Sequence, residues 1–134
     1  MKPYPLTVVT PDGCQFDGPA VRLVCRTVGG DAAILAGHCD YCTALAMGEA
    51  HIVTPDGNTR SAACIGGMLT VLGGRVPVIA TTWEWAEEVD ADRAERSRQR
   101  AEAKLKETGL DERELQLARA RLHRALVRKS VARR

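Results

Sequence analysis

Aromatic residues and long apolar runs are what this sequence has least of. Phe, Trp and Tyr make up only 4% of the 134 residues, so any core must be built mainly from Val, Leu, Ile and Ala. No apolar run approaches the ~18 residues that a membrane-spanning helix needs. The first residues, MKPYPLTVVTPDG, have no apolar segment of the secretory type, so we expect a cytoplasmic protein with no direct membrane insertion.

Recognisable catalytic motifs are also absent. The sequence has no G-x-S-x-G, no P-loop and no H-E-x-x-H. Its three histidines, His38, His51 and His123, lie in different segments, and nothing in the sequence places a nucleophile beside any of them. We therefore expect a protein that is not an enzyme.

Five cysteines are an odd number, which fits poorly with a secreted disulfide framework. Cys39 and Cys42 form a C-x-x-C pair beside His38, with His51 further along. Structural zinc usually takes two closely spaced ligand pairs, and His51 has no such neighbour. A redox dithiol would open a helix in a βαβ unit, which this region does not resemble. We expect no metal, although a small zinc- or thiol-binding β protein is an alternative. Buried positions are expected for the other three, Cys14, Cys25 and Cys64.

Residues 1–86 have the pattern of a β domain. Short β-branched runs alternate with Gly and Pro, and the turn signal TPDG occurs at 10–13 and again at 54–57. Many short strands at this spacing predict an antiparallel β-sandwich or flattened barrel.

Residues 87–134 have the pattern of a helical hairpin. Asp90 is a candidate N-cap, and Gly109 a candidate C-terminal glycine for the first helix. Asp111 followed by Glu114 forms a capping box that starts a second helix. Each helix carries only a thin stripe of mostly small apolar residues, so the hairpin must pack against the β domain or a partner to be stable. The predicted fold class is α+β.

Charge is concentrated at the C-terminal end. Residues 111–134 carry eight basic and three acidic side chains, for a net charge of +5 on a chain whose total is +2. Such a tail suits an acidic partner, so a nucleic-acid or protein adaptor is a second alternative. The tail has no aromatic residue for base stacking, and we therefore expect no nucleic-acid partner.

Two long blocks of the sequence match one family. They are LTVVTPDGCQFDGPAVRLVCRTVGGDAAILAGHCDYCTAL and IGGMLTVLGGRVPVIATTWEWAEEVDADRAERSRQRAEAKL. From end to end the chain resembles the bacterial epsilon subunit of F-type ATP synthases. The resemblance implies a non-catalytic part of the rotating central stalk, peripheral to the cytoplasmic side of the inner membrane, in a machine that couples proton or other ion transport to ATP synthesis.

The resemblance also implies partners. The β domain would bind the gamma subunit and the ring of c subunits. Asp31 through His38 would form the loop facing that ring, and Cys39 and Cys42 would occupy positions that usually hold Ala and Leu. The hairpin would either fold against the β domain or extend along gamma to the alpha and beta subunits and inhibit ATP hydrolysis. Basic side chains would then meet an acidic segment of beta: Arg121, Arg124, Arg128 and Lys129.

Some members of the family bind regulatory ATP on the folded hairpin, and no other cofactor is implied. Matched position by position, the residues of this possible ATP site are Glu84, Val89, Asp90, Arg93, Ala94, Arg100, Arg119 and His123. Val89 replaces the usual Ile or Leu, and His123 stands where the family has an Arg.

Overall fold

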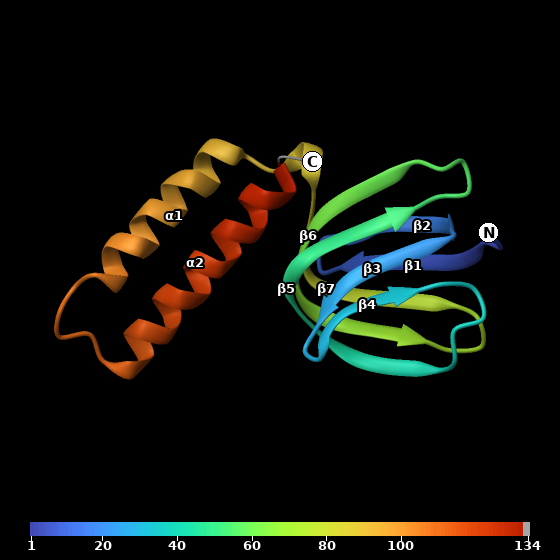
Figure 1. Cartoon of the computed structure of the whole chain (residues 1–134), viewed down its shortest axis with the longest axis horizontal. Coiled ribbons are helices and arrows are strands. Elements are labelled where there is room, and N and C mark those ends of the chain that lie inside the picture. Colours follow the sequence, from blue (N-terminus) through green and yellow to red (C-terminus); the bar gives the residue numbers. More distant parts are fainter. Residues whose placement is uncertain (133–134) are drawn as a thin grey trace.

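The computed structural model describes residues 1–132, and the last two residues of the predicted hairpin, 133 and 134, lie outside the described part. The strands are β1 (Tyr4–Thr10), β2 (Gly13–Ala20), β3 (Arg22–Thr27), β4 (Gly30–Ile34), β5 (Tyr41–Val53), β6 (Thr59–Val71) and β7 (Val76–Trp85). A short 3-10 turn, η1 (Ala86–Glu88), leads to the helices α1 (Ala91–Leu105) and α2 (Glu112–Ala132). The predicted β domain followed by a helical hairpin is confirmed (Figure 1).

The strands form one curved sheet in the order β2-β1-β7-β6-β5-β3-β4. The two longest strands, β5 and β6, bend where the sheet folds over on itself beside the helices (Figure 1). Every strand pair is antiparallel except β1 with β7, which is parallel. The predicted antiparallel sandwich is therefore a sandwich built from a mixed sheet.

Alternating side chains fill the space inside the sheet. In β1 the inward residues are Tyr4, Leu6 and Val8, and in β7 they include Val76 and Val78. Leu, Ile, Val and Ala make up most of the rest of this core, as the sequence predicts, and Trp83 and Trp85 are also buried in it. One polar group inside the core is satisfied, because the Tyr4 hydroxyl donates a hydrogen bond of 2.7 Å to the carbonyl of Ile34.

The cysteines divide into two groups. Cys25 and Cys64 are buried in β3 and β6, as expected. Cys14 is exposed on β2, so the prediction of a buried Cys14 is wrong. The reason is topological: β2 is an edge strand with only one neighbour, and its first residues lie at the rim of the sheet.

Both TPDG turns lie where the sequence predicts them. They join β1 to β2 and β5 to β6, and Gly57 has the positive φ of 86° that such a turn requires. The prediction of a loop from Asp31 to His38 is wrong in its first half, since residues up to Ile34 belong to β4. The connecting loop is shorter and begins at residue 35.

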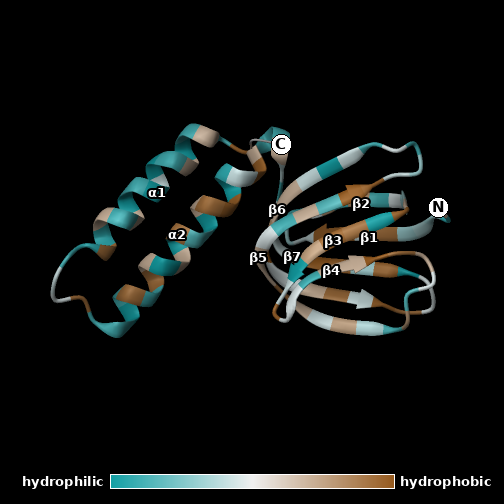
Figure 2. Cartoon of the chain, viewed as in Figure 1, coloured by the Kyte–Doolittle hydropathy of each residue, from teal (hydrophilic) through white to brown (hydrophobic). Residues whose placement is uncertain are grey.

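The helix starts are set by local capping. The Asp90 carboxylate accepts a hydrogen bond of 3.0 Å from the amide of Arg93, and Asp111 accepts one of 2.7 Å from Glu114. The first helix ends at Leu105, before Gly109, which lies in the connecting loop with φ of 78°. Both helices are polar over most of their surface (Figure 2).

Candidate functional site

The hairpin touches the sandwich mainly through the end of α2. Val127 and Val131 pack on Ala63 of β6, with Ala86 and Val89 of the junction beside them. This cluster is small, and it is separate from the large core of the sandwich. Burial of so few apolar groups stabilises the docked hairpin by only a few kcal/mol, on the order of 0.8 kcal/mol per buried methylene.

Two polar contacts join α2 to the sheet. Arg128 Nε donates to Glu84 Oε1 over 2.7 Å, and both side chains are about one-third exposed. Ser130 Oγ donates to Glu49 Oε1 over 2.6 Å, while the other oxygen of Glu49 lies 3.4 Å from His51 Nε2. These contacts orient the helix end above the small apolar cluster.

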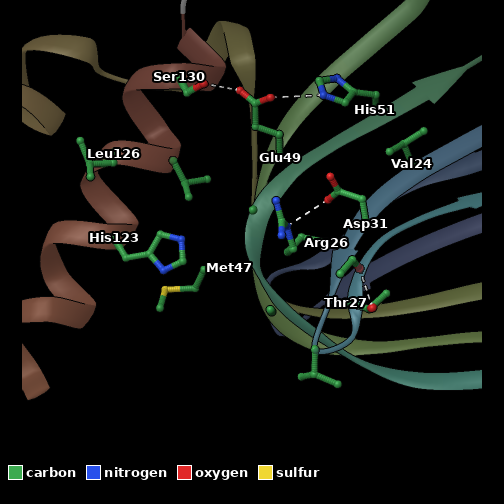
Figure 3. Close-up of a pocket in the computed structure, with 15 residues that line it drawn as sticks. Val24, Arg26, Thr27, Asp31, Met47, Glu49, His51, His123, Leu126 and Ser130 are labelled. Atoms are coloured by element: carbon green, nitrogen blue, oxygen red, sulfur yellow. Dashed lines mark hydrogen bonds and ion pairs between the residues drawn. The ribbon is translucent and has the colours of Figure 1, made fainter.

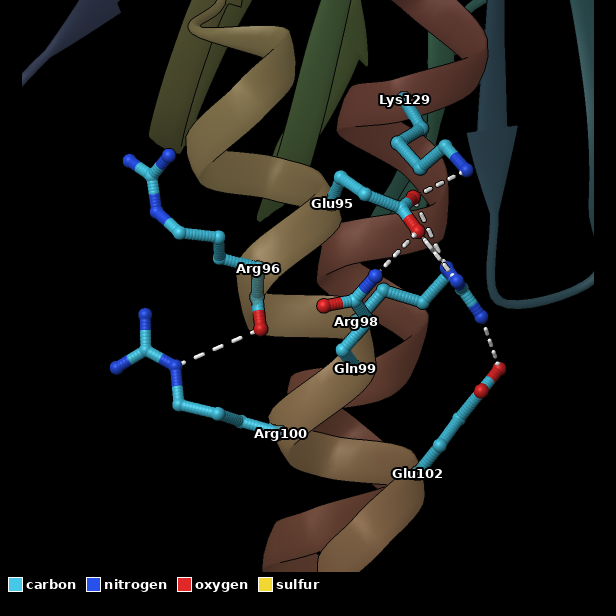
Figure 4. A network of polar contacts seen from close by, with 7 residues as sticks. All are labelled: Glu95, Arg96, Arg98, Gln99, Arg100, Glu102 and Lys129. Carbon is cyan, nitrogen blue, oxygen red and sulfur yellow. Dashed lines mark hydrogen bonds and ion pairs between the residues drawn. The ribbon is translucent and has the colours of Figure 1, made fainter.

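A network of ion pairs on α1 reaches across to α2 through Glu95. Glu95 of α1 lies 2.5 Å from the Lys129 ammonium of α2 and also pairs with Arg98, which reaches Glu102 over 2.7 Å (Figure 4). Hydrogen bonds from Arg98 and Lys129 lower the pKa of Glu95 to about 2. Figure 4 shows Arg96 and Arg100 on the opposite side of α1 from this network.

Half of the predicted ATP-site residues surround one cavity at the junction. Glu84, Asp90, Arg93 and Ala94 line it. The cavity measures about 250 Å³ and is bounded by the start of α1, the end of β7 and the end of α2. Four more residues line this cavity, and the sequence did not indicate them as ATP ligands: Glu88, Ser97, Ala125 and Arg128. Val89 belongs to the docking cluster instead.

An adjoining cavity of about 430 Å³ lies between the two helices. Its charged lining residues are all basic: Arg100, Lys104, Arg121, Arg124 and Arg128. Ser97 and Arg128 line both cavities, so the two form one groove that is acidic at the junction and basic towards the hairpin loop. We call this feature the hairpin groove.

Besides Val89, two predicted members of the ATP site, Arg119 and His123, lie outside the hairpin groove. Arg119 is exposed and lines neither cavity, and His123 lines a different pocket between α2 and the sheet. The α2 residues that line the cavity between the helices are Ala118, Arg121, Arg124 and Arg128. The structure therefore does not place Arg119 and His123 with Arg93 and Arg100. The missed signal is the spacing of Ala118, Arg121 and Ala125, which share one helix face.

The pocket lined by His123 has a volume of about 650 Å³. It lies between α2 and strands β3 to β5, and Met47, Leu126 and Val127 form part of its wall (Figure 3). Its charged groups are already paired, since Arg26 Nε lies 3.0 Å from Asp31 and His51 lies beside Glu49.

Asp31 and His38 lie at opposite ends of β4. Asp31 follows the turn nearest α2 and pairs with Arg26, whereas His38 lies in the loop that leaves the far end of the strand. His38 packs against Tyr41, with ring centroids 5.7 Å apart, and exposed Leu35 and Leu72 lie on neighbouring loops. The two residues do not form one surface loop.

The cysteine pair at this end is exposed. Cys39 lies in the loop and Cys42 near the start of β5. Within residues 1–132 there is no group of three or more His, Cys, Asp or Glu side chains placed to hold a metal ion. The same residues contain no helix with the length and apolar character required to cross a bilayer.

Comparison with known proteins gives the class. Residues 4–86 match the family model "ATP synthase, Delta/Epsilon chain, beta-sandwich domain", and residues 87–133 match "ATP synthase, Delta/Epsilon chain, long alpha-helix domain". Both parts of the structure thus fall in one class of ATP synthase subunits. The chain belongs to the family of ATP synthase epsilon chains, which are non-catalytic subunits of F-type ATP synthases.

Individual relatives agree with this assignment. The chain is 40% identical over 134 residues to the ATP synthase epsilon chain of Ruminococcus albus, covering 98% of each. It is 35% identical to that of an Exiguobacterium species, covering 94% of this chain and 93% of the relative.

Solved structures support the fold. A chain of the Euglena gracilis mitochondrial ATP synthase superposes with a TM-score of 0.83 at 23% identity, over 93% of this chain and 78% of that one. A chain of the central stalk/c-ring structure of the Tetrahymena thermophila mitochondrial ATP synthase superposes with a TM-score of 0.67 at 18% identity. The match covers 96% of this chain and 95% of that one.

Proposed function

We propose that this chain couples the gamma subunit to the c ring through its sandwich and inhibits ATP hydrolysis through its hairpin. The observation that carries the inhibitory role is the thin attachment of α2. A cluster built around Ala63, Val127 and Val131 and the contacts made by Glu84 and Glu49 are its main links to the sheet.

A weak attachment suits a two-state element. A hairpin with two supports of similar free energy redistributes between them when either support changes by a few kcal/mol. The same basic residues then serve both states. Arg128 and Lys129 pair with Glu84 and Glu95 in the folded hairpin, and in the extended hairpin they are free for an acidic segment of the beta subunit.

The test compares ATP hydrolysis by the catalytic complex assembled with the full-length chain and with a chain ending at residue 86. We expect hydrolysis to rise when residues 87–134 are removed, while the shortened chain still co-purifies with gamma. Unchanged hydrolysis at low and high ATP would refute the inhibitory role. Loss of co-purification with gamma by the full-length chain would refute the coupling role.

The sandwich end that carries His38 would face the c ring. That end is remote from the helices (Figure 1), and it exposes Leu35, Tyr41 and Leu72, with the Tyr41 ring beside that of His38. Apolar side chains at an exposed loop end are typical of a subunit contact. The chain would then be peripheral, at the cytoplasmic side of the bacterial inner membrane. Substitution of Leu72 by Asp should weaken binding to the c ring without unfolding the sandwich.

Regulatory ATP is a second element of the proposal. The hairpin groove offers carboxylates and backbone at the junction for a base, and arginines further along for phosphates. ATP bound there would stabilise the folded, non-inhibiting hairpin by mass action. Calorimetric titration of the isolated chain with ATP tests this directly, and the absence of heat at millimolar ATP would refute it.

A further inference from the structure

The basic half of the hairpin groove extends beyond every residue that the sequence assigned to an ATP site. Lys104 lies one helical turn past Arg100 on α1, and Arg121 lies about one turn before Arg124 on α2. Neither was predicted as a ligand of the site. Together they form the end of the groove that is nearer to the hairpin loop.

The charges of this half are largely uncompensated. Lys104 pairs with Glu107 over 3.1 Å, and Arg128 pairs with Glu84. Among residues 1–132 the other three, Arg100, Arg121 and Arg124, make no ion pair. Glu95, which pairs across to α2, is occupied by Arg98 and Lys129, and Glu102 pairs with Arg98 within α1.

The closed hairpin therefore gathers like charges from two helices around one cavity. Such an arrangement opposes closure unless an anion bridges the helices. The cavity has only Ala101 and Ala118 as apolar lining residues, and no aromatic ring, so it offers little that would recognise a base. Its chemistry is that of a site for a chain of phosphates.

We propose that Lys104 and Arg121 bind the terminal phosphate of a linear chain of at least three phosphates, and that this contact bridges α1 and α2. The inference rests on the proposed nucleotide site, whose ligand it specifies. The phosphate chain can come from a nucleoside triphosphate or from inorganic oligophosphate. A diphosphate held by Arg100, Arg124 and Arg128 would not reach the pair.

Calorimetry on the full-length chain tests this with four ligands: ATP, ADP, tripolyphosphate and pyrophosphate, at fixed ionic strength. The double variant K104Q/R121Q should bind the two triphosphates about ten-fold more weakly and leave the two diphosphates nearly unchanged. The matched control is K106Q/R113Q, which removes the same charge from exposed positions that make no ion pair within the described chain. The control should bind all four ligands as the unmodified chain does.

The outcomes separate this inference from the nucleotide proposal. Equal weakening of diphosphates and triphosphates, or no weakening at all, would overturn the role of Lys104 and Arg121 while ATP binding stands. Binding of tripolyphosphate without ATP would overturn the nucleotide proposal and leave the phosphate site. If the unmodified chain binds none of the four ligands, both are overturned.

Discussion

Arg128, near the end of α2, donates a hydrogen bond of 2.7 Å to Glu84, near the end of β7. The pair spans 44 residues of sequence and lies at the point where the hairpin groove meets the sandwich. The Arg128–Glu84 contact thus both docks α2 on the sheet and lines the acidic end of the hairpin groove. The pair would couple the proposed nucleotide site to the position of the hairpin.

Replacement of Glu84 by Gln should release the end of α2. The substitution keeps the side-chain shape and removes a partly exposed ion pair worth about 1 kcal/mol, so opening of the hairpin should become several-fold more frequent. Hydrogen exchange of α2 amides measures this, and hydrolysis by the assembled complex should be inhibited more strongly. The control is Glu88→Gln, which lines the same cavity without an ion pair among the described residues. Equal protection of the α2 amides from hydrogen exchange in both variants would contradict a stabilising role for the Arg128–Glu84 pair.

Replacement of Val131 by Ala should also weaken docking. The Val131 side chain is fully buried against Ala63, and loss of two methyl groups should cost about 2 kcal/mol. Limited proteolysis should then cut the hairpin faster while the melting of the sandwich changes little. Leu117→Ala is the control, because Leu117 lies on α2 but is 45% exposed. Similar proteolysis of the two variants would show that Val131 does not anchor the helix.

Acid should open the hairpin through Glu95. Its pKa is lowered from the ordinary 4.5 to about 2 by Arg98 and Lys129, so its ionised form favours the folded state. The stabilisation is fully present above pH 4.5 and is lost as the pH falls towards 2. Helix content followed by circular dichroism should therefore decline over this range, and less steeply in Glu95→Gln. The control Asp12→Asn, in the turn between β1 and β2, should keep the profile of the unmodified chain.

The parts of this architecture that the sequence predicts are local. Asp90 and Asp111 cap their helices because the partner amide is three residues away, and TPDG turns depend on four consecutive residues. The sequence does not predict strand β4, because its segment GDAAI contains only one β-branched residue. Antiparallel pairing with β3 stabilises this strand despite its low β-propensity. The parallel pairing of β1 with β7 joins segments some 70 residues apart, which no local pattern encodes.

The candidate site was predicted where it depends on one segment. Glu84, Asp90, Arg93 and Ala94 lie around a single helix start, and the structure brings them together. The contribution of α2 was misassigned because it depends on how the two helices are aligned. The first helix ends at Leu105, not at Gly109, and that alignment places Arg124 and Arg128, not Arg119 and His123, opposite α1.

Glycine is required at Gly67 and is replaceable at Gly109. Both have positive φ, but a Cβ at Gly67 would lie 2.0 Å from the carbonyl oxygen of Ile79, whereas a Cβ at Gly109 meets nothing within 4 Å. Gly67→Ala should destabilise the sandwich by about 3 kcal/mol or more, through backbone strain and a clash with β7. Gly109→Ala should cost about 1 kcal/mol. Urea unfolding curves measure both, and equal costs would contradict the close approach of β6 and β7.

The thiols should react in two classes. Burial raises the pKa of Cys25 to about 11 and that of Cys64 to about 12, so at pH 8 both remain protonated as well as covered. Cys14, Cys39 and Cys42 are exposed. A disulfide reagent at pH 8 should therefore modify three thiols per chain rapidly and the remaining two only after denaturation. Cys39→Ala and Cys42→Ala should each lower the rapid count by one. Fast modification of all five thiols in the folded chain would contradict burial of Cys25 and Cys64. A rapid count of one that rises to three after reduction would show that Cys39 and Cys42 are oxidised to a disulfide in the isolated protein.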